Sequence, residues 1–144
     1  MGRATIGRMK ASAVGALLLS LWSITVPSLG RRLGLGVEVP AKVEVVDHVI
    51  PGIAAAIASI VALALLRRRS GDDIGLLLAA GVVALSGLWM TTTHLPLVVQ
   101  AGQGIVRWPA AIWHSAAGPV ILALGVALFA MRPEGAEAGA PTHS

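Results

Sequence analysis

Three histidines lie at the edges of long apolar runs, where their imidazole rings could bind a metal ion or a haem. His48 and His114 are each followed four residues later by a glycine, in the stretches VVDHVIPG and AIWHSAAG. Two histidines at equal depth on neighbouring helices could be the axial ligands of a haem, and His94 could complete a metal site with them. The acidic ligands available to a metal site on that side of the membrane are Glu38, Glu44 and Asp47.

The same histidines also fit a structural role, which we expect to be the commoner one. Polar side chains inside a bilayer are expensive, but histidines at its water interface cost little. His48 would cap its helix beside the carboxylate of Asp47, and His114 would donate a hydrogen bond to the loop packed above it. Under this hypothesis the protein binds no cofactor, and the two histidines are counterparts inherited through a repeat.

Four apolar segments must position these side chains. The 144 residues are 56% hydrophobic and 12% charged, with a mean hydropathy of +0.81. A bilayer core of about 30 Å needs roughly 20 apolar residues in helical conformation, and the sequence has four such stretches between its charged residues. They predict an all-α integral membrane four-helix bundle with spans at 11–30, 46–66, 74–94 and 109–131.

The flanking charges predict the orientation of these spans. The N-terminus, the connection after the second span and the tail hold seven Lys and Arg residues, whereas the other two connections hold four. By the positive-inside rule both termini face the cytoplasm, and the protein lies in the inner (plasma) membrane. The predicted parts are a cytoplasmic N-terminus (1–10), a first two-helix repeat (11–66), a cytoplasmic turn (67–73), a second repeat (74–132) and a disordered cytoplasmic tail (133–144).

The two halves of the chain carry matching residues in the same order. When Leu21 is aligned with Leu88, LWSITVPSLG lies over LWMTTTHLPL. With one residue absorbed in the following loop, His48 and Gly52 lie over His114 and Gly118. Because a repeated two-span unit keeps its orientation, the halves are predicted to be parallel repeats about an axis along the membrane normal.

This repeated pattern resembles the SPW repeat family of small bacterial and archaeal membrane proteins. Trp22 and Pro27 keep the spacing of that family's motif, and Trp113 fits its second tryptophan. The chain departs from the family around Pro27, where Val-Pro-Ser replaces Ser-Pro-Trp, and His94 stands at the proline position of the second copy. His114 stands where the family usually has asparagine. The resemblance implies paired transmembrane helices and carries no activity with it.

Small residues mark where neighbouring helices could approach closely. They recur at four-residue spacing on the second and third spans, and a glycine follows the histidine of the fourth. Such contacts hold a bundle together by van der Waals packing, and they could equally form the face of a homo-oligomer or a larger membrane complex. The predicted packing residues are Gly52, Ala56, Ser59, Ala80, Ala84 and Gly118.

The sequence offers little that an enzyme needs. It has no cysteine, no paired carboxylates within a span and no phosphate-binding glycine loop. It also has no basic face with interleaved aromatic residues, so we expect no nucleic-acid partner. The prediction is a multi-pass protein of the lipid bilayer, not an enzyme, acting as a structural or accessory subunit. The alternatives are a haem or metal module and, because serines lie in the middle of the spans, a small-molecule transporter.

Overall fold

The computed structural model of the chain describes residues 2–37, 39–68 and 73–131, and within these ranges it is all-helical, without strands. This confirms the predicted helical class. The predicted tail at 133–144 and most of the turn at 67–73 lie outside the described residues. The elements are α1 (Arg3–Arg32), α2 (Ala41–Glu44), the π-helical turn η1 (Val45–Val49), α3 (Ile50–Arg68), α4 (Asp73–Gly102), α5 (Trp108–Ser115) and α6 (Ala117–Ala130).

Four helical segments in the described part of the chain are long and apolar enough to cross a membrane. They coincide with the four predicted spans, but the first begins earlier than predicted, at Arg3. Ala, Met, Lys and Arg are good helix formers, so the helix extends beyond the apolar run that the bilayer requires. The segments are Arg3–Arg32, Ala41–Arg68, Ile74–Gly102 and Trp108–Ala130.

The third segment ends later than predicted. The sequence prediction ended it at His94, whereas α4 continues through Pro96 to Gly102. The threonines before His94 do not break the helix, because their hydroxyls donate hydrogen bonds back to carbonyls of the preceding turn, such as Thr91 to Gly87 at 2.7 Å. His94 therefore lies inside the helix rather than at its end.

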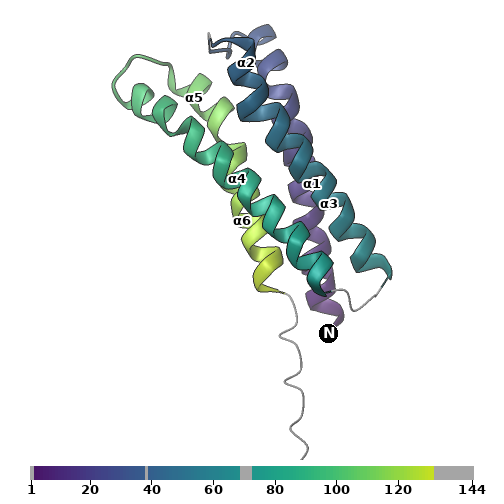
Figure 1. The fold of residues 1–144 in the computed structure, drawn as a ribbon. Helices are drawn as coiled ribbons and strands as arrows, with labels where there is room; N and C mark the ends of the chain where they lie inside the picture. The colour runs from purple at the N-terminus through teal and green to yellow at the C-terminus, as the bar shows by residue number, and fades with distance from the viewer. Residues whose placement is uncertain (1, 38, 69–72, 132–144) are drawn as a thin grey trace, which may run out of the picture.

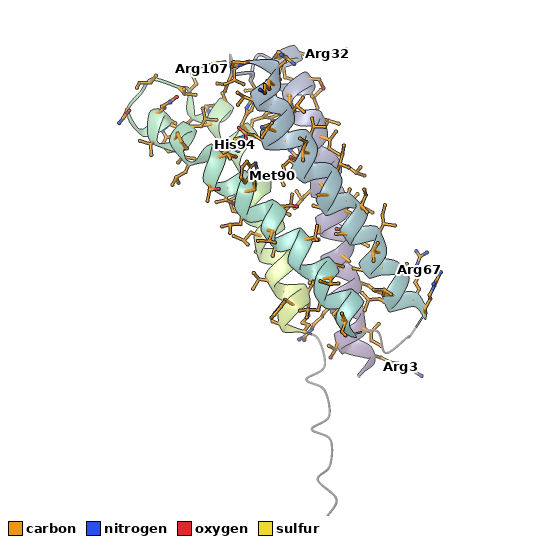
Figure 2. The ribbon with its side chains drawn as sticks, in the orientation of Figure 1. Arg3, Arg32, Arg67, Met90, His94 and Arg107 are labelled. Carbon is orange, nitrogen blue, oxygen red and sulfur yellow. The ribbon has the colours of Figure 1, made fainter. Side chains whose placement is uncertain are left out.

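The four segments pack side by side in alternating directions (Figure 1). Both α1 and α4 contact α3 and α6. Arg3 and Arg67 lie at one end of the molecule, which we call the terminal end, and Arg32 and Arg107 lie at the other (Figure 2). We call the latter the histidine end, because His94 lies on that half of α4.

Small residues fill the interior and let the helices approach closely. Among the predicted packing residues, Ala56, Ser59 and Ala80 are buried, and the half-buried Ala84 lies against Gly125. Several further alanines are buried in the same core. Because alanine is small and the helices are close together, few large side chains are buried. They are Ala13, Ala16, Ala55, Ala58 and Ala62.

Gly52 and Gly118 are also buried, where paired helices touch. A Cβ atom added at Gly52 would lie 2.8 Å from the Ile24 Cγ1 atom of α1. One added at Gly118 would lie 2.7 Å from the Thr91 backbone nitrogen of α4. Ile24 and Thr91 are equivalent positions in the alignment of the two halves. The α1–α3 and α4–α6 pairs thus meet at matching positions of the sequence.

Candidate functional site

The three histidines named from the sequence come together at the histidine end. His48 on η1, His94 on α4 and His114 on α5 form what we call the histidine cluster, and each is less than 8% exposed. The Nε2 atoms of His48 and His94 lie 2.9 Å apart. The ring centroids of His48 and His114 are 5.7 Å apart. His48 therefore lies between the other two rings.

His48 does not cap a helix, contrary to the structural hypothesis from the sequence. The helical segment already begins at Ala41, and His48 lies in the π-helical turn that joins α2 to α3. This helical segment starts at Ala41, directly after Pro40, which is its N-cap residue. The Nδ1 atom of His48 lies 3.4 Å from the Ser23 hydroxyl of α1.

His94 and His114 are held in the same way by their own helices. His94 Nδ1 donates to the Met90 carbonyl at 2.7 Å, and His114 Nδ1 donates to the Ala110 carbonyl at 3.1 Å. A carbonyl can only accept, so this network assigns the proton of each ring to Nδ1 and leaves a lone pair on Nε2. The expected bond from His114 to an overlying loop was wrong, because the carbonyl four residues earlier takes its Nδ1 proton.

The Nε2 lone pair of His114 has no partner. It is one of three buried side-chain polar atoms without a hydrogen bond in the described part of the chain. Leaving such an atom unpaired costs about 1–3 kcal/mol, so it calls for an explanation such as a bound ion or a water molecule. The three rings do not yet converge: no group of three His, Cys, Asp or Glu side chains within residues 2–37, 39–68 and 73–131 is placed to hold a metal ion.

A pocket of about 340 Å³ connects the histidine cluster to the surface of the histidine end. All three histidines line it, together with the acidic residues Glu44 and Asp47. Glu44 is 5% exposed and forms an ion pair with Arg31 at 3.2 Å. Two of the three acidic residues noted in the sequence thus face the same pocket as the histidines, while Glu38 lies outside the described residues.

Two functional candidates beneath the cluster were missed by the sequence analysis. The Ser23 hydroxyl of α1 donates to the Met90 Sδ atom of α4 at 3.1 Å, and both side chains are buried. Ser23 and Met90 are equivalent positions when Leu21 is aligned with Leu88. The alignment of the two halves was therefore the signal that could have paired them, because it places them at equivalent positions.

The tryptophans of the repeated pattern make comparable contacts between the halves. The Trp22 ring of α1 lies edge-on to Trp113 of α5, with centroids 4.6 Å apart. Trp89 of α4 donates its Nε1 proton to the Val46 carbonyl of η1 at 3.3 Å. In each half, the tryptophan of the first helix thus anchors the helical turn that carries a histidine of the other half.

Comparisons with protein-family models, with curated proteins and with solved structures give no match. The resemblance to the SPW repeat family thus depends on its short motifs alone.

Proposed function

We propose that the protein is a multi-pass integral membrane protein whose histidine cluster binds a transition-metal ion. The observation that carries this proposal is the buried, unpartnered Nε2 atom of His114 beside the contacting pair of His48 and His94. Imidazole nitrogens are common ligands of zinc and copper, and a bound ion would satisfy the lone pair. The protein would act as a metal-binding accessory subunit rather than as an enzyme.

The hydrogen bonds around the cluster support metal binding. Metal-ligating histidines almost always donate their second ring nitrogen to a carbonyl, a carboxylate or water, which fixes the ring with its lone pair toward the ion. His94 and His114 already have this arrangement. In the metal-free cluster the His48 proton lies on Nε2, between the two Nε2 atoms; when an ion takes its place and the proton moves to Nδ1, the Ser23 oxygen, 3.4 Å from Nδ1, can accept it.

The spacing of His48 and His94 suits a single tetrahedral metal ion, whereas the haem predicted from the sequence would use His48 and His114, whose ring centroids are 5.7 Å apart. With metal–nitrogen bonds of about 2.0–2.1 Å, two imidazoles on opposite sides of an iron place their nitrogens about 4 Å apart, whereas tetrahedral ligands are about 3.4 Å apart. The observed His48–His94 distance is 2.9 Å. The pair therefore needs to open by only about 0.5 Å for a tetrahedral ion, and the His114 ring has to turn toward it.

The fold within the membrane is proposed to be a four-helix bundle of two parallel repeats, α1 to α3 and α4 to α6. The matching glycine contacts at Gly52 and Gly118 support this arrangement. So do the matching tryptophan contacts and the Ser23–Met90 pair. The charge distribution favours the histidine end as the outer one, with both termini in the cytoplasm of the cell.

The first test concerns orientation. A C-terminal fusion to green fluorescent protein is expected to fluoresce, because the reporter matures in the cytoplasm. Alkaline phosphatase joined after Gln103, in the connection between α4 and α5, is expected to be active, because it folds only when exported. The reverse pattern, with an inactive phosphatase at Gln103 and an active one at the C-terminus, would contradict the proposed topology.

The second test concerns the metal. Detergent-purified protein titrated with Co²⁺ is expected to bind one ion per chain, with visible absorption bands typical of tetrahedral cobalt. His48→Gln, His94→Gln and His114→Gln should each weaken binding by at least about 100-fold, at or beyond the upper end of losses from partners that merely orient a ligand. His143→Gln removes a histidine outside the cluster and serves as the control.

The structural interpretation of the histidines makes the opposite prediction. If the wild-type protein binds no stoichiometric Co²⁺ or Zn²⁺, or if His114→Gln binds as tightly as the wild type, the metal proposal is wrong. A Soret band in the purified protein that disappears in the double variant of His48 and His114 would instead identify a haem.

A further inference from the structure

The Ser23 hydroxyl of α1 bonds to the histidine cluster rather than to its own helix. The side chain is fully buried, and its hydrogen-bond partners in the described part of the chain lie on η1 and α4. These partners are Met90 Sδ at 3.1 Å, His48 Nδ1 at 3.4 Å and the His48 carbonyl oxygen at 3.5 Å. Ser20 is equally buried, but its hydroxyl donates to the Ala16 carbonyl of α1 at 2.6 Å. Because bonding to the preceding turn is usual for a serine inside a helix, the contacts of Ser23 need another explanation.

Without an ion, the Ser23 hydroxyl has one proton and more than one acceptor. Met90 and His94 lie one helical turn apart on α4 (Figure 2). His94 Nδ1 donates to the Met90 carbonyl, so His94 Nε2 accepts, and its 2.9 Å bond to His48 requires the His48 proton on Nε2. His48 Nδ1 then carries a lone pair on the side of Ser23, and Met90 Sδ can also only accept. A single hydroxyl proton cannot satisfy both side chains.

An ion at the Nε2 atoms removes this competition. The ion takes the lone pair of His48 Nε2, and the ring stays neutral with its one proton on Nδ1. The N–H bond at Nε2 breaks and releases a proton to solvent in the pocket, while a new N–H bond at Nδ1 takes a proton up, so the ring keeps its charge. His48 Nδ1 then donates to the Ser23 oxygen, and the Ser23 proton stays with Met90 Sδ. Each of these polar atoms now has a partner.

We infer that Ser23 is a positioning residue that favours the metal-binding tautomer of His48, the form with its proton on Nδ1. Met90 Sδ assists by holding the Ser23 proton away from the ring. This inference rests on the proposed function and deepens it. His94 and His114 need no such residue, because backbone carbonyls, which can only accept, already fix their protons on Nδ1. Within the cluster, His48 is the ring that must change tautomer to become a ligand.

The test compares two buried serines of α1 in the full-length, detergent-purified protein. Ser23→Ala leaves the Nδ1 proton of metal-bound His48 without its acceptor, so it is expected to weaken Co²⁺ binding by about 10- to 100-fold. Ser20→Ala removes a hydroxyl that bonds within α1 and is expected to leave the affinity unchanged. Met90→Leu removes the sulfur at nearly constant volume and frees the Ser23 proton for His48, so it should weaken binding by a smaller factor than Ser23→Ala.

Nitrogen NMR of the histidine-labelled protein reads the tautomers directly. Without metal, His48 is expected to carry its proton on Nε2, whereas His94 and His114 carry theirs on Nδ1. With Zn²⁺ bound, all three rings should carry the proton on Nδ1. The His48 signals are assigned by their loss in His48→Gln. A change of packing alone would not move the proton from one ring nitrogen to the other.

The possible failures are distinguishable. If Ser23→Ala binds Co²⁺ as tightly as the wild type, or if His48 already carries its proton on Nδ1 without metal, the inference is wrong while the histidine site stands. If Ser20→Ala weakens binding as much as Ser23→Ala, the buried hydroxyls act through packing, and the inference is again wrong. If the wild type binds neither Co²⁺ nor Zn²⁺, the proposed function fails.

Discussion

Replacing Gly118 by alanine is expected to weaken the packing of α4 against α6 by about 2 kcal/mol or more. The added Cβ would lie 2.7 Å from the Thr91 backbone nitrogen and 2.9 Å from the Met90 carbonyl carbon. Backbone atoms cannot move aside as the end of a flexible side chain can, so the helices must separate. The small residues around the contact then lose their van der Waals neighbours.

Two other glycines make matched controls for this prediction. Around Gly81 of α4 no atom lies within 4 Å of an added Cβ, so Gly81→Ala should be neutral or stabilising by up to about 1 kcal/mol through helix propensity. The effect of Gly52→Ala on the free energy of unfolding should lie between those of Gly118→Ala and Gly81→Ala, because its closest contact is the flexible Ile24 side chain. The measurement is the free energy of unfolding in mixed micelles. Equal values for Gly118→Ala and Gly81→Ala would contradict the close approach of α4 and α6.

The sequence was sufficient to predict the four long apolar helical segments of the described residues, but not where they end. Counting apolar residues between charges measures the length that a bilayer needs, and this placed all four segments. A helix, however, ends where its backbone hydrogen bonds end. The helices therefore extend beyond the predicted spans, at the residues from Arg3 onward and from Leu95 to Gly102. Ending the third span at the ionisable His94 therefore gave a false boundary.

The members of the candidate site were predictable only in part. The equal spacing of His48 and His114 from their glycines indicated that both lie at one end of the molecule. Whether these rings lie near His94 depends on how α4 is rotated about its axis. Because α4 is apolar on nearly all sides, its sequence does not indicate this rotation. Met90 was missed for the same reason, because an apolar residue on an apolar helix carries no signal of its chemistry.

The proposed repeat would carry an asymmetric site on a symmetric scaffold. In the alignment of the two halves, Pro27 and Ser23 of the first correspond to His94 and Met90 of the second. The proposed ligand His94 therefore corresponds to Pro27 of α1, which cannot bind a metal, and Ser23 of α1, whose hydroxyl lies 3.4 Å from His48 Nδ1, corresponds to Met90.

Replacing Arg31 by glutamine is expected to destabilise the protein by about 2 kcal/mol. Glu44 is 5% exposed, and its carboxylate would lose the guanidinium that lies 3.2 Å away. Removing one partner of a fully buried pair typically costs about 3–5 kcal/mol. The smaller value of about 2 kcal/mol applies here because the Arg31 side chain is 58% exposed, so water screens the pair.

A double-mutant cycle isolates this effect from other consequences of losing Arg31. Glu44→Gln alone should cost less than about 1 kcal/mol, since it leaves only an exposed arginine without its partner. Adding Glu44→Gln to Arg31→Gln should recover most of the lost stability, because no buried charge then remains. The same unfolding measurement in mixed micelles checks all three variants. If the double variant is as unstable as the sum of the two single variants, the ion pair does not contribute, and Arg31 acts through its packing at the end of α1 instead.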